Sequence, residues 1–143
     1  MFGEARVIVM IKTPVTGMFE GEYASFAIDN LGDDADFLWG IFAEEHEDTA
    51  MIHLQLTTNK VVEDWQYHAI FDHYESEKFS GIVNSFSELE NTGNPAWELT
   101  FTATPASLAE KVRMLLSIHR DELLEIYEAI SGMEGEYYER AEP

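Results

Sequence analysis

An apolar stripe with helical spacing runs through the last third of the chain, and it limits the fold more than any other feature. Between Ser107 and Ser131 apolar residues recur every three or four positions, which places them on one side of a helix: Leu108, Val112, Leu115, Leu116, Leu123, Ile126, Tyr127 and Ile130. Ser107 and Glu110 have the spacing of a capping box, and Gly132 is a typical stop. We therefore expect one amphipathic helix over about 107–131, roughly 37 Å long at 1.5 Å per residue.

The sequence ahead of this helix predicts short strands joined by turns. Strand-like runs cover 6–13, 23–29, 37–44, 50–58, 79–88 and 97–103, and the polar stretch 29–36 is expected to be a loop. Within 50–58, Ile52, Leu54 and Leu56 alternate with polar residues, as in a strand with one buried face. The predicted fold is therefore α+β: a single domain over 1–143, with a mostly antiparallel sheet of about six to seven strands, mainly within 5–104. The long helix packs on one face of this sheet, and a short acidic tail covers 133–143.

Residues 64–74 fit two kinds of secondary structure. As a helix, the segment has two opposed apolar clusters, whereas as a strand it has Trp65, Tyr67, Ala69 and Phe71 on one face. Aromatic enrichment favours the strand, and a strand is the prediction.

The charge of the chain excludes some partners and favours others. There are 28 Asp and Glu against 8 Lys and Arg, for a formal net charge of −20. Binding to the backbone of DNA or RNA needs clustered cations, and an anionic membrane would repel this chain. We therefore expect no nucleic acid and no membrane as partners, and a basic protein as the favoured one. Acidity that serves only solubility or salt adaptation remains the alternative.

The chain contains no cysteine, which excludes disulfides and thiolate sites and fits a reducing compartment. The N-terminus lacks the pattern of a secretory signal, and the longest apolar run is only Val7 to Ile11. The expected location is the cytoplasm.

The best candidate binding site in the sequence is an acidic patch. Seven acids and no Lys or Arg lie between residues 33 and 48: Asp33, Asp34, Asp36, Glu44, Glu45, Glu47 and Asp48. If the segments that carry them lie side by side, they form a surface of one sign that speeds association with a basic partner.

His119 lies in the middle of the apolar stripe and is the second candidate. It is either a buried switch, ligand or base, or a neutral core histidine whose two ring nitrogens are hydrogen-bonded. The second interpretation is favoured, because no nucleophile or further catalytic motif accompanies this residue.

Other groupings give weaker signals. Asp64, His68 and Asp72 would line one side of a helix with metal-ligand chemistry, and the acidic loop 29–36 has oxygen ligands suited to calcium. Neither matches a known metal motif, and solvated surfaces are the better interpretation. The chain also lacks a phosphate-binding glycine loop and a G-x-S-x-G elbow, so no metal, cofactor or catalytic residue is predicted.

Charges along the predicted helix oppose its dipole. Lys111 and Arg113 lie near its start, while Glu122, Glu125 and Glu128 lie toward its end. A partner, or a homodimer in which two such helices pack antiparallel, would pair these charges, and chance in an acidic chain is the alternative.

Three functions are compatible with the sequence. The first is a non-enzymatic protein-binding or regulatory module that engages a basic partner. The second is a small ligand-binding protein or enzyme with an aromatic-lined pocket that uses His119. The third is a domain whose acidity serves only solubility; whether the chain is an enzyme is open, and a non-enzyme is favoured.

Overall fold

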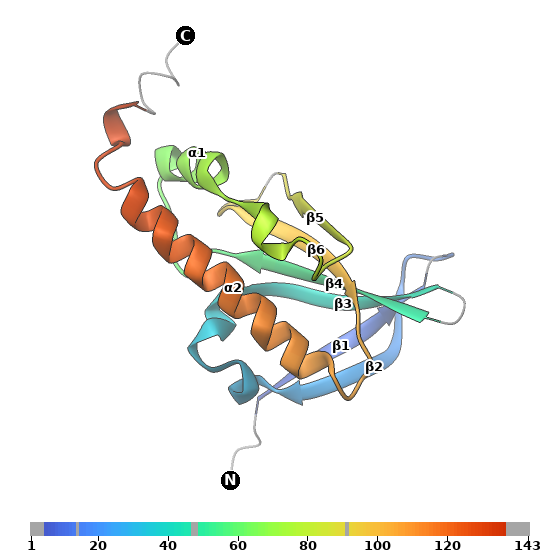
Figure 1. Cartoon of the computed structure of the whole chain (residues 1–143). Coiled ribbons are helices and arrows are strands. Elements are labelled where there is room, and N and C mark those ends of the chain that lie inside the picture. The colour runs from blue at the N-terminus through green and yellow to red at the C-terminus, as the bar shows by residue number, and fades with distance from the viewer. Residues whose placement is uncertain (1–4, 14, 47–48, 91, 137–143) are drawn as a thin grey trace.

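A computed structural model of the chain describes residues 5–13, 15–46, 49–90 and 92–136. Within these residues the chain forms a six-stranded sheet and two α-helices (Figure 1). The elements in chain order are β1 (Arg6–Lys12), β2 (Phe19–Ala27), the 3₁₀ segment η1 (Ile28–Phe37), β3 (Leu38–His46), β4 (Thr49–Thr57), α1 (Asp64–His73), the 3₁₀ turn η2 (Ser76–Phe79), β5 (Ser85–Glu88), β6 (Ala96–Thr102) and α2 (Leu108–Ala129).

The sheet has the strand order β2-β1-β3-β4-β6-β5. All of its strand pairs are antiparallel except β1 with β3, which is parallel. A parallel neighbour needs a crossover, and η1 carries the chain from the edge strand β2 back to β3 beyond β1. The expected α+β fold is confirmed: one mostly antiparallel sheet with a long C-terminal helix.

The core lies between the sheet and α2, which crosses one face of the sheet (Figure 1). On β4, Ile52, Leu54 and Leu56 are fully buried, as their alternation predicts. All of the predicted helix stripe is buried except Tyr127, which is half-buried. Burial of this one-sided stripe is what holds α2 on the sheet.

The ends of α2 differ in part from the expectation. The Ser107 side chain makes no cap for the helix; its hydroxyl instead accepts hydrogen bonds from the Thr104 backbone N–H at 3.1 Å and the Thr104 hydroxyl at 2.9 Å. The predicted capping box is therefore wrong, because Ser107 already has near-helical backbone angles and its hydroxyl is used by the preceding turn. At the other end Gly132 has φ +87°, a left-handed conformation that favours glycine, as a helix stop requires.

The prediction of a strand at 64–74 is wrong, because this segment is α1. Gln66 accepts a hydrogen bond from the Glu63 backbone N–H at 2.9 Å, which starts the helix. Trp65, Ala69 and Ile70 are buried, and the helix end packs on the sheet through Phe71, whose ring lies 5.3 Å from that of Trp97. Two packed sides explain why its apolar residues form two clusters.

Two further segments differ from the prediction. The expected loop 29–36 is 3₁₀ structure within η1. Of the predicted strand 79–88 only β5 is extended, and η2 precedes it. The predicted acidic tail 133–143 lies mostly outside the described residues. In the described ranges no helix is long and apolar enough to cross a membrane.

Candidate functional site

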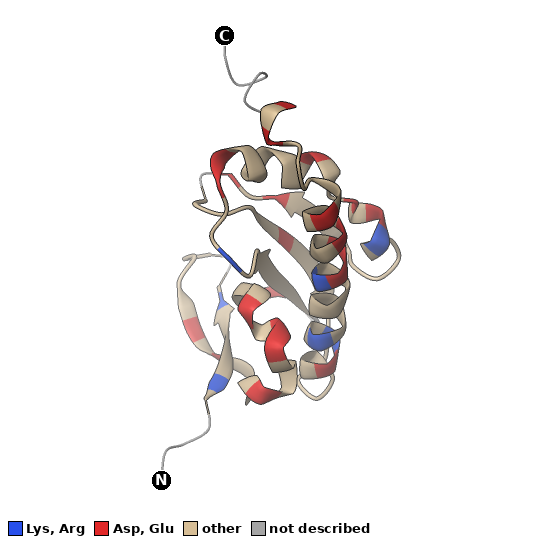
Figure 2. Ribbon diagram, turned by 90° about the vertical axis from the view of Figure 1, so that its left-hand side faces the viewer, with Lys and Arg blue, Asp and Glu red and all other residues tan. Residues whose placement is uncertain are grey.

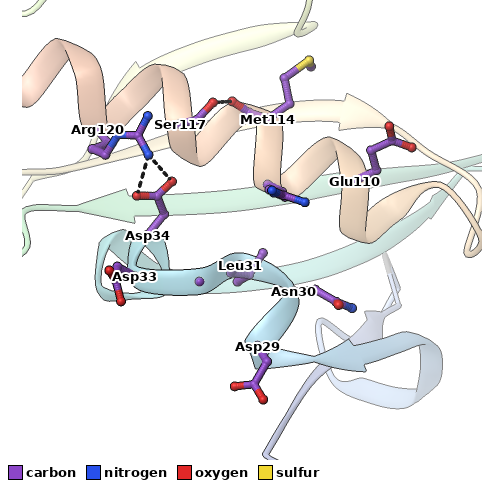
Figure 3. Close-up of a pocket in the computed structure, with 11 residues that line it drawn as sticks. Asp29, Asn30, Leu31, Asp33, Asp34, Glu110, Met114, Ser117 and Arg120 are labelled. Atoms are coloured by element: carbon purple, nitrogen blue, oxygen red, sulfur yellow. Dashed lines mark hydrogen bonds and ion pairs between the residues drawn. The ribbon is translucent and has the colours of Figure 1, made fainter.

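A cavity of about 740 Å³ lies between η1 and α2 (Figure 3). Residues 29–34 of η1 form one wall, and Glu110, Arg113, Met114, Ser117 and Arg120 of α2 form the other. Glu110, Arg113, Ser117 and Arg120 are spaced by three or four residues, and Met114 follows Arg113 directly. All five therefore share the side of the helix that is turned away from the core. The lining contains four carboxylates and two arginines, which makes this cavity charged and polar.

Arg120 and Asp34 join the two walls. Arg120 Nη1 donates hydrogen bonds to both carboxylate oxygens of Asp34, at 2.9 and 3.1 Å, and Figure 3 shows the two side chains meeting across the gap. Arg120 Nε also donates to Asp121 at 3.1 Å. The carboxylates of Asp121 and Asp34 raise the pKa of Arg120 above its ordinary value. This ion pair therefore fixes η1 against α2 and keeps the distance between the walls.

Gly32 shapes the η1 wall. Its backbone angles are φ +61° and ψ −147°, and the 3₁₀ structure is interrupted there. Residues other than glycine are strained at these backbone angles, although a Cβ at Gly32 would meet no atom within 4 Å. The glycine is needed for the direction of the chain, which turns the second half of η1 back toward α2.

Arg113 is the cation of this cavity that has no partner among the residues described by the structure. It is exposed, and no hydrogen bond or ion pair links it to any other part of the chain that the structure describes. The other six described Lys and Arg side chains all have a partner: Ser25 for Arg6, the ring of Phe42 for Lys12, the ring of Tyr127 for Lys60, Glu122 and Glu125 for Lys78, the carbonyl of Thr102 for Lys111, and Asp34 and Asp121 for Arg120. Arg113 is thus available to a ligand.

The predicted acidic patch is divided between the two ends of β3. Asp33, Asp34 and Asp36 lie in η1, before β3 begins, whereas Glu44 and Glu45 lie near its other end. An extended strand rises about 3.3 Å per residue, so roughly 20 Å separates the two groups, and Figure 1 shows η1 at the start of β3, away from the other end of that strand. The structure therefore does not bring these residues together in one patch. Glu47 and Asp48 lie outside the described residues.

The two groups also differ in their local contacts. Glu44 is paired with His53, whose Nε2 lies 3.1 Å from a Glu44 carboxylate oxygen, while Glu45 is exposed. In η1, Asp34 is nearly buried and paired with Arg120, as described above. Glu44 and Asp34 are therefore structural carboxylates that already have partners.

Three acids of η1 remain available: Asp29, Asp33 and Asp36, here called the η1 carboxylates. All three are exposed, and none has an ion pair or hydrogen bond with another described residue. Figure 3 shows Asp29 and Asp33 extending away from α2, and Figure 2 shows the acids of η1 gathered on one side of the molecule. The η1 carboxylates are thus an anionic surface, of which Asp29 and Asp33 also line the cavity.

His119 is fully buried, and both of its ring nitrogens are hydrogen-bonded. Nε2 lies 2.7 Å from the Thr57 carbonyl oxygen, which can only accept, so Nε2 carries the proton. Nδ1 therefore accepts the hydrogen bond of the Tyr74 hydroxyl, at 2.7 Å. Burial lowers the pKa of His119 to about 4, and the hydrogen bond to Thr57 opposes only part of this effect.

The surroundings of His119 form a closed network. Burial, together with the nearby charge of Glu122, raises the pKa of Tyr74. Glu122 is itself buried and forms an ion pair with Lys78 of η2 at 2.6 Å. The cavities of about 740, 360 and 170 Å³ formed by described residues are not lined by His119. The imidazole is a hydrogen-bonded core residue here, out of reach of a ligand in any of these three cavities.

The weaker metal candidates lie on two separate elements, α1 and η1. Asp64, His68 and Asp72 are exposed along one side of α1, as the helical alternative requires. Among the described residues no group of three or more His, Asp or Glu is arranged to hold a metal ion.

Arg113 and Arg120 were not identified as site residues from the sequence. Their spacing of seven places them on the same side of α2 and was a usable signal. The pairing of Arg120 with Asp34 joins residues 86 positions apart, and nothing in the sequence indicates it.

Comparison with known proteins places the chain in a family. A family model, described as a family of unknown function (DUF6762), matches residues 2–138. The chain belongs to this family. The match to DUF6762 extends from β1 to the end of α2, so both walls of the cavity lie within the matched region. No curated protein and no solved structure matches the chain.

Proposed function

We propose that this chain is a non-enzymatic protein-binding module that engages a basic partner through the η1 carboxylates. The observation that carries the proposal is the exposure of Asp29, Asp33 and Asp36 on one short segment, without an ion pair to any described residue. Asp34 anchors this segment to α2, so the three carboxylates are held on a fixed frame.

Charge supports a basic partner in particular. With a net charge of −20, the field of the whole molecule attracts cationic surfaces and repels anionic ones. The η1 carboxylates would then direct such a partner to one place, because negative charges gathered on a rigid segment make the local electrostatic potential more negative.

The competing enzyme hypothesis has less support. It requires that His119 reach a substrate, yet its imidazole is fully buried and both ring nitrogens have partners within the core. The cytoplasm remains the proposed location. A chain without cysteine fits this reducing compartment, because disulfides are rare there.

A quantitative pull-down from native lysate tests the proposal. The bait is the wild-type chain, the triple variant Asp29→Asn, Asp33→Asn, Asp36→Asn, or the matched control Glu20→Gln, Glu22→Gln, Glu90→Gln. Both variants remove three exposed carboxylates, so their net charge is the same. We expect one basic protein to be enriched by the wild type and the control, and lost by the η1 variant and at high salt.

Two results would contradict the proposal. Equal loss in both variants would mean that net charge alone attracts the captured proteins. Capture of no basic protein by the wild type at low salt would favour acidity that serves solubility only.

A further inference from the structure

The cavity between η1 and α2 combines an unpaired guanidinium with surplus carboxylates. From this combination we infer that the cavity binds a small zwitterion, an amino-carboxylate of the size of an amino acid, whose carboxylate pairs with Arg113. The η1 carboxylates act on a macromolecule at the molecular surface, whereas this site takes a small molecule between two elements. The two sites share the carboxylates of Asp29 and Asp33, whereas the pairing with Arg113 belongs to this site alone, so variants of Arg113 separate the inference from the proposed function.

Arg113 provides the anionic half of the recognition. A guanidinium presents paired N–H donors that match the two oxygens of a carboxylate. Arg120, the other arginine of the cavity, already gives Nη1 to Asp34 and Nε to Asp121. Arg113 has no such partner among the described residues, so its donors are the ones that a ligand carboxylate can use.

The remaining charges of the lining explain why the ligand must also be cationic. Asp29, Asp33, Asp34 and Glu110 oppose Arg113 and Arg120, so the lining carries two more negative charges than positive ones. A simple anion would gain the contact to Arg113 but would be repelled by these carboxylates, and a phosphate dianion would be repelled more strongly. An ammonium group on the same ligand offsets that repulsion, because the surplus negative charge of the lining attracts it.

Size and polarity agree with a small polar molecule. The volume of about 740 Å³ lies within the range of small-molecule sites, which is about 300–1,000 Å³. Asn30 adds an amide that can donate and accept, and Met114 adds an apolar surface for an aliphatic side chain. The Arg120–Asp34 pair fixes the spacing of the walls before the ligand arrives, which lowers the ordering cost of binding.

Two-dimensional NMR titration of the full chain tests this inference. The probes are the individual α-amino acids, with acetate, methylamine and inorganic phosphate as molecules that carry only one kind of charge. We expect at least one amino acid to shift the backbone amides of Gly32 and Ser117, and to bind more tightly than each single-charge probe.

Variants assign the binding to Arg113. The variant Arg113→Gln should weaken amino-acid binding by about tenfold or more, the loss expected for a charge-assisted pair. The control Lys12→Gln removes a cation at the other end of β1, where Lys12 lies beside Glu44 of β3 and far from η1, and should bind like the wild type. Because Arg113 is exposed and unpaired, its variant should keep the wild-type unfolding midpoint, which is measured alongside.

Three outcomes would overturn the inference. The first is that no amino acid shifts the cavity amides. The second is binding that Arg113→Gln leaves unchanged. The third is binding of acetate, methylamine or phosphate as tight as that of the best amino acid, because then one charge is sufficient. A failed pull-down of a basic protein has no bearing on any of these outcomes, so the two proposals fail separately.

Discussion

A neutral imidazole at the centre of the core links the stability of this protein to pH. The ordinary pKa of histidine is 6.5, and burial lowers that of His119 to about 4. The unfolded chain therefore binds a proton at His119 between these two values, while the folded chain does not. The contribution of His119 to the free energy of unfolding is fully present above pH 6.5 and is lost as the pH falls toward 4. The difference amounts to about 3 kcal/mol.

The substitution His119→Leu should remove this pH dependence. At pH 7 we expect a loss of about 1–3 kcal/mol in the free energy of unfolding, because the Tyr74 hydroxyl and the Thr57 carbonyl lose their buried partner. On lowering the pH to about 5, the difference between wild type and variant should shrink by about 2 kcal/mol. Urea unfolding at several pH values measures both effects.

The control for this experiment is His68→Leu, which replaces an exposed histidine on α1. Its stability should follow that of the wild type at every pH. Parallel curves for wild type and His119→Leu would show that His119 does not cause the pH dependence.

At the scale of elements, η1 depends on one backbone conformation. Gly32 has φ +61°, a left-handed backbone conformation in which a residue with a Cβ is strained, although the space around the glycine is open. The substitution Gly32→Ala should therefore destabilise the protein by about 1–3 kcal/mol through backbone strain alone. The change in urea midpoint measures this effect.

Gly93→Ala is the matched substitution for this test. Gly93 also has open space around it, but its φ does not lie in the left-handed range. Its replacement should change the free energy of unfolding by less than about 1 kcal/mol, with stabilisation the favoured direction. Equal effects at both glycines would contradict the assigned strain.

The elements also differ in how far their sequences predict them. α2 has one buried side, so its period of 3.6 is visible along the sequence and the helix is found within about two residues at each end. α1 packs on both the sheet and α2, and its two apolar sides imitate the alternation of a strand. The neighbours of α1 thus decide what its own pattern leaves ambiguous.

At the scale of the whole molecule, the acidity is a property of the entire chain. The net charge is −9 over residues 1–50 (11 acids, 2 bases), −6 over 51–100 (8 and 2) and −5 over 101–143 (9 and 4). Six of the seven described Lys and Arg side chains are already engaged within the molecule, and among the described acids their ion pairs involve Asp34, Asp121, Glu122 and Glu125. Repulsion among like charges should therefore outweigh attraction in the folded state.

Added salt should consequently stabilise the protein. Raising NaCl from about 0.02 M to about 0.5 M shortens the screening length well below 10 Å, which weakens the repulsion between surface carboxylates. We expect the urea midpoint at pH 7 to rise over this range. It should rise less in the variant Glu20→Gln, Glu22→Gln, Glu90→Gln, which carries three fewer exposed charges; a midpoint that falls with salt would mean that the ion pairs dominate.

The sequence by itself determined the fold class, the long helix and the buried side of that helix, His119 included. It could do so because burial on one side leaves a regular period in the chain, and that period needs no knowledge of the partner surface. The net charge likewise follows from composition alone.

Only the tertiary structure decided which charged residues meet. Asp34 and Arg120 are 86 positions apart and pair across the cavity, whereas Asp36 and Glu44 are close in sequence but lie at opposite ends of β3. An extended strand carries neighbours in sequence far apart, and packing brings distant segments together. The candidate site on η1 and α2, with Arg113 left unpaired within it, therefore appears only once the chain has folded.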